Sequence, residues 1–497
     1  MLVDGEHLSI EDVVNVARYG EKVEIATEIR EKIDKTRKAI EKILAEDKPI
    51  YGVNTGFGEL ANVKISNNKI KELQKNLIRS HACGVGEPLE EEIVRAMILL
   101  RLNSLAKGYS GVRYEVLDRL AEALNKKFYP FVPSQGSVGA SGDLVQLAHV
   151  VLALIGEGEA IYNGKTLPAK EVLDKLEIEP LELEAKEGLA LINGCQFMAA
   201  ILCLALHDAY NLLKNAQIAG AMSFEALRGI DDAFKQEIAK ARPYRGQMKA
   251  SKNLWNLTRN SGISRKGKVQ DAYSLRCMPQ VFGAFYESLD FIEKMVSTEI
   301  NSATDNPLIF DNEVLSGGNF HGEPVALSLD LLNIILTKLS SFSERRVFRL
   351  LDEKLSELPA FLAEKPGLNS GLMILQYTAA SLVSENKSLS FPSVDSIPTS
   401  ANQEDYQSMG SISAIKCRRI LKNAEKVVAI EFITACQALE FINEEPSPAV
   451  KKAYEVIRKH VKKLDEDKPL YKEIEKVANL IHNKEILKEV EKIVKIE

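Results

Sequence analysis

The sequence predicts a mainly α fold, a bundle of long helices with a smaller N-terminal part that carries an Ala-Ser-Gly loop. Glycine and proline are sparse, at 29 and 17 of 497 residues, and long stretches contain neither. That spacing suits long helices better than the frequent turns of an all-β protein. Apolar residues also recur at intervals of three, four and seven between Glu, Lys and Arg, as on amphipathic helices.

The periodic segments predict helices in order along the chain. In the first, 23–44, the apolar residues recur mostly at spacings of three, four or seven; they are Val23, Ile25, Ile29, Ile33, Ile40, Ile43 and Leu44. The last long segment is apolar over so much of its surface that we expect it to be buried on most sides. The predicted helical segments are 23–44, 89–106, 143–155, 196–217, 280–300, 325–351, 371–389 and 411–442, followed by charge-rich amphipathic helix from residue 446.

Three polar, glycine-bearing stretches interrupt this pattern. Residues 50–58, 132–142 and 301–323 contain too many small residues to be helical throughout. The run IGEGEAIYNGKTLP (155–168) predicts a short β-hairpin. Because sites are commonly carried on loops that a rigid scaffold positions, we expect the chemistry in the three polar stretches.

The domain division that the sequence supports is loose. We expect residues 1–190 to form the N-terminal part and residues 191–497 the long-helix core with the C-terminal helices, an organisation also compatible with one domain. The chain shows no internal repeat and no low-complexity linker.

Composition excludes several classes of partner. The 64 Lys and Arg against 70 Asp and Glu give a net charge of -6, which does not favour nucleic acid. The six cysteines lack CxxC spacing and predict free thiols. An acidic N-terminal segment and the lack of 18 uninterrupted apolar residues predict a soluble, cytoplasmic protein without a membrane span. The histidines form no HExxH pair, so we expect no metal site.

The segment FVPSQGSVGASGDLVQLAHV (131–150) is a glycine-rich turn that leads into a helix. One interpretation is an anion-binding turn, but neither GxGxxG nor GxxxxGK[ST] is present. Another is backbone cyclisation, in which the amide nitrogen of Gly142 attacks the carbonyl of Ala140 and two waters leave, one carrying the hydroxyl of Ser141. Only small residues permit so tight a turn. The product, 4-methylidene-imidazole-5-one, is an electrophile that needs no metal or diffusible cofactor.

The run GSVGASGDL resembles the signature of the aromatic amino acid ammonia-lyase family, and its histidine branch most closely. The resemblance implies a homotetramer of mainly helical subunits, with active sites shared among three chains and a small amino acid as substrate. Further matching runs are VDGEHLS (3–9), YGVNTGFG (51–58), LINGCQ (191–196), VQDAYSLRC (269–277), NSATDNPL (301–308), SGGNFHGEPVA (316–326), SENKSL (384–389) and SVDSIPTSANQED (393–405).

The resemblance also implies roles for particular residues. Tyr51, otherwise interpretable as a packing aromatic, matches the family's catalytic base, and a phenolate is basic enough if cations or dipoles stabilise it. Arg276 matches the residue that binds the substrate carboxylate, a task that suits its planar fork. Gln270 and Tyr273 lie six and three residues earlier, so a helix would project all three on one side. With Asn193 they are expected around the prosthetic group and the substrate.

Four further residues bear on the choice of substrate. By sequence alone His81 is interpretable as a core histidine and Glu404 as a carboxylate near a helix N-terminus. In the histidine branch the residues matching both face the imidazole of the substrate. Met373 stands where that branch has methionine, and Phe320 fits a wall against the ring. His321, adjacent to Phe320 in an extended segment, is expected to face the other way.

The resemblance therefore predicts deamination of L-histidine to trans-urocanate and ammonia, the first step of histidine degradation. The alternatives are a tyrosine or phenylalanine ammonia-lyase and an aromatic 2,3-aminomutase. Ser80-His81, Met373 and Glu404 argue against the first pair. Tyr406-Gln407 replaces the His-Val usual in the histidine branch, Gly322 stands where Ala is commoner, and Cys195 and Met278 are also off the usual pattern. A fumarase-type signature is absent, and a non-catalytic helical scaffold would need no electrophile.

Overall fold

The computed structural model describes residues 1–46, 49–263, 268–311 and 313–497. It confirms the predicted class, because long helices dominate and each β-sheet has only two strands. The chain divides into two compact units. The first comprises Met1–His207, Glu293–Asp330 and Pro392–Ile415, and the second comprises Asp208–Ile292, Leu331–Phe391 and Lys416–Glu497. The boundary at residue 190 stays a prediction.

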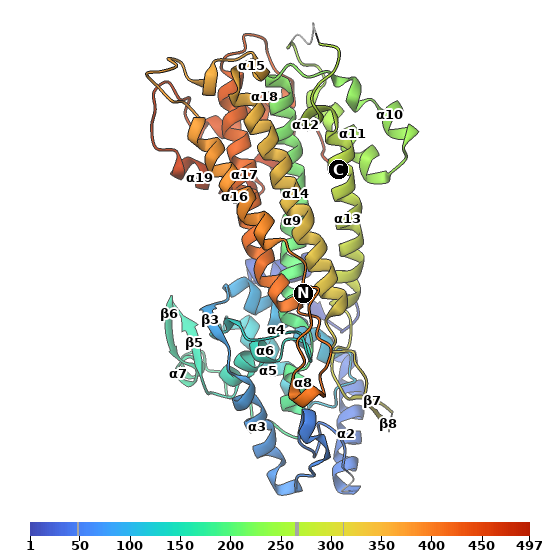
Figure 1. Ribbon diagram of the computed structural model, residues 1–497. Coiled ribbons are helices and arrows are strands. Elements are labelled where there is room, and N and C mark those ends of the chain that lie inside the picture. The colour runs from blue at the N-terminus through green and yellow to red at the C-terminus, as the bar shows by residue number, and fades with distance from the viewer. Residues whose placement is uncertain (47–48, 264–267, 312) are drawn as a thin grey trace. The chain divides into compact units, whose positions relative to one another are not determined.

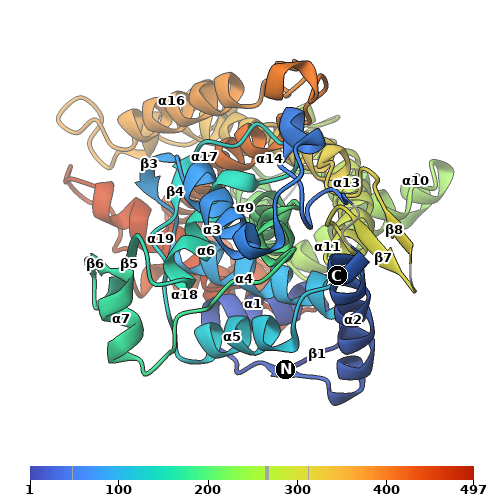
Figure 2. The same cartoon turned by 90° about the horizontal axis from the view of Figure 1, so that it is seen from below.

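In the first unit, helix α4 (Glu91–Ala106) forms the centre of the core. Every residue of α4 from Ile93 to its end is buried. The helix packs against α1 (Ile10–Tyr19) and α5 (Tyr114–Asn125), which lie beside it in Figure 2. The other helices within this unit are α2 (Arg30–Glu46), α3 (Ile70–His81), α6 (Leu144–Leu154), α7 (Ala169–Lys175) and α8 (Glu187–Ile192).

The described strands of the first unit form four two-stranded pairs. The predicted hairpin is confirmed: β5 (Glu159–Tyr162) and β6 (Lys165–Pro168) pair antiparallel, and Asn163 and Gly164 between them both have positive φ, as a type I′ turn requires. The parallel pair is β1 (Leu2–Val3) with β2 (Glu24–Ile25); the antiparallel pairs are β3 (Val85–Pro88) with β4 (Pro133–Gln135), β5 (Glu159–Tyr162) with β6 (Lys165–Pro168), and β7 (Leu308–Phe310) with β8 (Glu313–Leu315).

In the second unit, Glu431 joins three long helices that run side by side in Figure 1. This fully buried carboxylate on α17 (Gly410–Leu439) accepts hydrogen bonds from Ser223 on α9 (Gln196–Ala226) at 2.8 Å and from Arg346 on α14 (Glu323–Leu351) at 2.5 and 2.7 Å. A buried charge is tolerated when it is paired, and this paired cluster links the three helices at one level. Four helices have residues in both units: α9 (Gln196–Ala226), α13 (Met278–Glu299), α14 (Glu323–Leu351) and α17 (Gly410–Leu439). The helices within the second unit are α10 (Gln236–Ala241), α11 (Arg245–Thr258), α12 (Tyr273–Arg276), α15 (Glu353–Ser356), α16 (Met373–Leu389), α18 (Pro448–Arg458), α19 (Tyr471–His482) and α20 (Glu485–Val490).

Most predicted helices are present, but one begins in the wrong place. The segments predicted from residue 89 onward correspond to α4, α6, α9, α13, α14, α16 and α17, although α9 continues to Ala226 instead of ending at 217. The helix predicted over 23–44 begins only at Arg30. Its first residues pair with β1 instead, and both backbone groups of Val23 bond to the side chain of Asn125 at 2.8 Å. These remote partners outweigh the local apolar periodicity.

Within the described part of the chain, two helices are long and apolar enough, by length and composition alone, to cross a membrane. They are α9 and α14, and 89% and 61% of their most apolar windows are buried inside the protein. Burial of this kind is usual for core helices of a folded domain. All six cysteines are free, as predicted, and four of them are buried.

Candidate active site

A cavity of about 490 Å³ opens in the first unit where the three predicted polar stretches meet. Tyr51 comes from the first stretch, Ser141 from the second and Phe320 from the third. Asn193 and Glu404 join them from two further predicted positions. The complete lining is Tyr51, Gly58, Glu59, Ala61, Asn62, Ser141, Asn193, Asn306, Ser316, Gly317, Phe320, Gln403 and Glu404.

The Ala140-Ser141-Gly142 loop is pressed against the backbone of Gly194. Gly142 has a φ of +78°, and a Cβ built on it would overlap the carbonyl oxygen of Gly194. The same carbonyl accepts a hydrogen bond from the backbone N–H of Asp143 at 2.7 Å. Only glycine fits here, both in conformation and in space. The position that attacks in the predicted cyclisation is therefore one where the structure requires the absence of a side chain.

Two polar side chains beside this loop fit the predicted prosthetic group. Asn193 donates to the carbonyl oxygen of Ser141 at 3.3 Å. Asp143 is fully buried and accepts from the backbone N–H of Met198 at 3.0 Å, in the first turn of α9. Asn193 Oδ1 and Asp143 Oδ1 are both buried and lack partners among the described residues. Burial raises the pKa of Asp143 to about 7, so the loop has a carboxyl beside it that can exchange a proton near neutral pH.

Tyr51 lies in a loop at the cavity wall, and its ring meets that of Phe57 edge-on at 6.4 Å. The backbone N–H of Gly58 hydrogen-bonds its hydroxyl and favours the phenolate. Burial has the larger effect and raises the pKa of Tyr51, and the negative charges of Glu404 and Asp305 add to the rise. The first unit by itself therefore favours the neutral phenol at this position.

Glu404 faces the predicted prosthetic loop across the cavity. Its carboxylate accepts from the hydroxyl of Ser141 at 3.2 Å and from that of Thr399 at 2.7 Å. Gln407 is buried, and its side-chain amide donates to the backbone carbonyl of Glu404 at 2.7 Å. One of the sequence departures from the histidine branch thus supports the loop that carries Glu404. Its neighbour Tyr406 is exposed and stacks on His321 at 5.8 Å.

His81 ends helix α3 and does not itself line the cavity. Its Nδ1 lies 2.9 Å from the carbonyl oxygen of Leu77. Because a carbonyl can only accept, a neutral His81 carries its proton on Nδ1 and keeps Nε2 as an acceptor. Burial lowers the pKa of His81, while the Leu77 bond and the charge of Glu404 oppose the change. The neutral form is therefore favoured.

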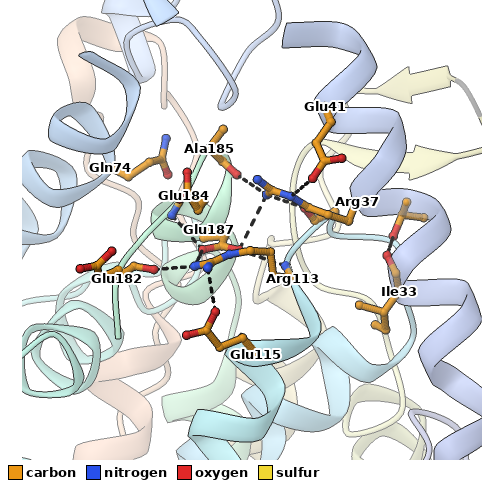
Figure 3. A network of polar contacts seen from close by, with 12 residues as sticks. Ile33, Arg37, Glu41, Gln74, Arg113, Glu115, Glu182, Glu184, Ala185 and Glu187 are labelled. Atoms are coloured by element: carbon orange, nitrogen blue, oxygen red, sulfur yellow. Dashed lines mark hydrogen bonds and ion pairs between the residues drawn. The ribbon is translucent and has the colours of Figure 1, made fainter. Parts of the chain in front are cut away.

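A buried ion cluster anchors the start of α8, the helix that leads to Asn193. Both oxygens of Glu187 accept from Arg113 at 2.8 Å, and Arg37 lies 3.7 Å away. Figure 3 shows these side chains converging from different parts of the chain. Glu187 also accepts from the backbone N–H of Glu184 at 2.8 Å. These bonds hold the N-terminal end of α8 in one place.

Four predicted site residues belong to the second unit. They are Gln270, Tyr273, Arg276 and Met373. Helix α12 begins at Tyr273, so the expectation that Gln270, Tyr273 and Arg276 share one helical face is wrong for Gln270. Arg276 donates to the backbone carbonyl of Asp271 at 2.8 Å and packs on the ring of Tyr273 at 4.6 Å. The irregular backbone of residues 268–272 precedes this short helix.

Sequence reasoning missed several residues around the cavity. Asn306 lines it and binds the backbone N–H of Gly317 at 2.7 Å. Behind it, Lys186 donates to Asp305 at 2.6 Å, and both side chains are fully buried. The run NSATDNPL contains Asp305 and Asn306, but its matching letters did not indicate which side chain faces the cavity. The sequence signal that could have indicated buried charge is the pair Lys186-Glu187, which directly precedes an apolar segment.

Two of the remaining differences from the histidine-branch pattern, Cys195 and Gly322, are explained by packing. Cys195 is buried, and its thiol donates to the carbonyl oxygen of Phe320 at 3.0 Å. A Cβ at Gly322 would overlap the end of the Met198 side chain. Among the described residues no group of three or more His, Cys, Asp and Glu side chains could hold a metal ion.

Comparison with known proteins defines the class. Residues 8–459 match the aromatic amino acid lyase family, and the chain belongs to that family. It is 50% identical to the histidine ammonia-lyase of Alkaliphilus oremlandii over 504 aligned positions, covering 100% of this chain and 99% of the relative. The histidine ammonia-lyase of Trypanosoma cruzi superposes with a TM-score of 0.93 at 40% identity, covering 99% and 95% of the two chains. The tyrosine aminomutase of Streptomyces globisporus superposes with a TM-score of 0.96 at 39% identity, covering 100% of both chains.

Proposed function

We propose that this chain removes ammonia from L-histidine and releases trans-urocanate, in the cytoplasm and as the first step of histidine degradation. The observation that carries the proposal is the cavity in which Ser141 of the Ala-Ser-Gly loop faces the carboxylate of Glu404 at 3.2 Å. A carboxylate in that place can accept a hydrogen bond from the N–H of an imidazole, whereas a phenyl ring offers no such donor. The full-length similarity to histidine ammonia-lyases supports the same substrate.

The prosthetic group is 4-methylidene-imidazole-5-one, formed from Ala140, Ser141 and Gly142. It supplies an electrophilic carbon that makes the substrate's amino group a better leaving group. Asn193 holds the loop through a hydrogen bond to the carbonyl of Ser141, and the backbone of Gly194 packs against Gly142. No metal and no diffusible cofactor is needed for this chemistry.

The chain's own side chains bind the substrate and move its proton. Tyr51 takes the β-proton, and Arg276 holds the carboxylate through two parallel hydrogen bonds. Glu404 accepts from the N–H of one imidazole nitrogen, and His81 helps to position the ring. Gln270, Tyr273, Asn193, Phe320 and Met373 complete the pocket. Since burial and nearby carboxylates raise the pKa of Tyr51, its phenolate needs a cation, and Arg276 is the cation we assign to that task.

We propose that this site is completed by other copies of the chain in a homotetramer. The residues expected to bind the carboxylate lie on a second unit whose surface carries large apolar side chains. Val269 is fully exposed and Tyr273 is 70% exposed. On α16, which begins at Met373, Ile374 and Tyr377 are exposed as well. A second copy covering these residues would bury apolar surface and bring Arg276 to a neighbouring cavity.

An aromatic 2,3-aminomutase is the second candidate. The observation in its favour is the close superposition with a tyrosine aminomutase. Such an enzyme returns the ammonia to the β-carbon instead of releasing it. The two outcomes differ in product, so they are separated by product analysis.

The test is to offer L-histidine, L-tyrosine and L-phenylalanine separately and to measure the unsaturated acid, ammonia and β-amino acid. L-histidine should be preferred by about 10⁴-fold or more, because a phenyl ring leaves Glu404 and His81 without partners. E404Q should lower kcat/KM for L-histidine by roughly 10- to 100-fold through loss of a charged hydrogen bond. H81L should lower histidine turnover and admit the other two substrates. Preference for tyrosine, or release of β-histidine, would contradict the proposal.

A further inference from the structure

Arg101, on the buried helix α4, is fully enclosed and contacts the backbone that supports the Ala-Ser-Gly loop. We infer that Arg101 is a positioning residue for the backbone cyclisation at residues 140–142, because its guanidinium fixes the Asn193–Gly194 segment against which Gly142 is pressed. The inference rests on the proposed function, in which that cyclisation makes the prosthetic group.

The guanidinium holds this segment from one side. Arg101 Nη1 donates to the backbone carbonyl of Asn193 at 2.7 Å and to the side chain of Gln196 at 3.0 Å. Gln196 in turn donates to the hydroxyl of Thr304 at 2.8 Å. A Cβ built on Gly194 would lie 2.6 to 2.7 Å from the polar atoms of all three side chains. The segment therefore cannot retreat toward α4.

The loop that cyclises lies on the other side of the same segment. Gly142 and Gly194 form a parallel bridge, and the side chain of Asn193 donates to Ser141. Cyclisation forms one bond, between the Gly142 nitrogen and the Ala140 carbonyl carbon. One water takes the Ala140 oxygen with the hydrogens of the Gly142 and Ser141 amides, and the other takes the Ser141 hydroxyl with its α-hydrogen. No oxidant is required, so the protein has to supply mainly geometry.

Arg101 differs from the other arginine buried in the same helix. The guanidinium of Arg95 donates hydrogen bonds to the backbone carbonyls of Val16, Ala17 and Leu124, which lie near the C-terminal ends of neighbouring helices. Arg101 instead leaves Nε and Nη2 without partners among the described residues. Burial lowers the pKa of Arg101 to about 10, with Asp305 opposing the change, so the group stays charged at neutral pH. An incompletely paired buried cation is costly, and a purely stabilising role would favour the arrangement of Arg95.

The experiment follows cyclisation in newly made chains. Wild type, R101M, R101K and the matched control R95M are expressed as full chains and sampled over time after induction. Mass analysis of the peptide containing residues 140–142 gives the fraction that has lost two waters. Thermal unfolding of the same samples measures the stability of each variant.

We expect R101M to lose its two waters about 10²-fold more slowly than wild type, the scale of a misplaced reacting group. R95M should unfold at a lower temperature yet cyclise at the wild-type rate. R101K keeps the positive charge but lacks the planar guanidinium, so its cyclisation should be slowed less than that of R101M. If R101M does not fold, the rate of cyclisation in R101K tests the inference. Cyclisation of folded R101M or R101K at the wild-type rate, or equal slowing in R95M, would overturn the inference. A wild-type chain of full mass would instead refute the proposed function, and the inference with it.

Discussion

At the scale of single residues, Gly142 offers the sharpest test of the prosthetic loop. Gly142 and Gly164 both have positive φ, but a Cβ on Gly164 meets nothing within 4 Å, whereas one on Gly142 overlaps Gly194. G142A and G164A should both lower the free energy of unfolding by about 1–2 kcal/mol, because alanine disfavours the left-handed conformation. Only G142A should be destabilised further, by the overlap with Gly194. We therefore expect G142A to abolish the two-water mass loss and the turnover, while G164A keeps both. Mass analysis and an activity assay of both variants check this.

The imidazole of His81 predicts how the protein responds to acid. Because burial lowers its pKa below the ordinary value of about 6.5, the folded chain takes up this proton at lower pH than the unfolded chain. The stability that depends on His81 is thus complete above pH 6.5, decreases as the pH falls toward the folded pKa and is constant below it. Protonation also removes the Nε2 acceptor, so kcat/KM should fall as the pH passes through the lowered pKa of His81 in the folded protein.

The corresponding variant is H81Q, which cannot be protonated. It should have roughly tenfold lower kcat/KM at neutral pH and a weaker decline toward acid, because an amide replaces the titrating ring. H7Q is the control, since His7 is exposed and lies near Asp4. Rates measured between pH 5 and 8 for all three proteins give the comparison. An acid limb in H81Q as steep as in wild type would assign the titration to another group.

At the scale of elements, the start of α8 depends on Glu187. Its carboxylate is fully buried, and it contacts both Arg113 and Arg37 (Figure 3). E187A leaves both arginines without this partner, and we expect it to lower the free energy of unfolding by about 3–5 kcal/mol. E115Q removes an exposed contact to the same Arg113 and should cost about 1 kcal/mol or less. Urea unfolding at one protein concentration measures both, and similar losses would contradict a special role for Glu187.

Apolar periodicity predicted the buried elements well and the paired segments poorly. Segments such as 325–351 follow the helical period because one face of the helix must be buried, and α14 occupies almost the same residues. Residues 23–29 have the same period, but their backbone bonds to β1 and to Asn125. Such pairing depends on residues about 20 and 100 positions away, which a local pattern does not contain. The short sheet β3–β4, in which Val85 pairs with Gln135, was missed for the same reason.

At the scale of the whole molecule, the sequence predicted much of the candidate site because its residues lie in recognisable runs. Tyr51, Ser141, Asn193, Phe320 and Glu404 come from five separate runs, and the fold brings all five to one cavity. The residues that hold the backbone of the cavity wall from behind could not be predicted in this way. Arg101 stands in an apolar helix whose sequence resembles that of any core helix, and only the fold reveals that its fork faces Asn193.

The proposed sharing of each site among chains predicts that two inactive variants restore each other's activity. In the proposed function S141A lacks the hydroxyl needed to form the prosthetic group and R276M lacks the guanidinium that holds the substrate carboxylate, so each variant alone should be inactive. If Ser141 and Arg276 of one site come from different chains, co-expression in equal amounts places a functional Ser141 opposite a functional Arg276 in about a quarter of the sites. Ammonia release from the purified mixed tetramers should therefore approach a quarter of the wild-type rate. Tetramers of the separate variants mixed without exchange of subunits are the control, and mixed tetramers as inactive as that control would show that each site is built within one chain.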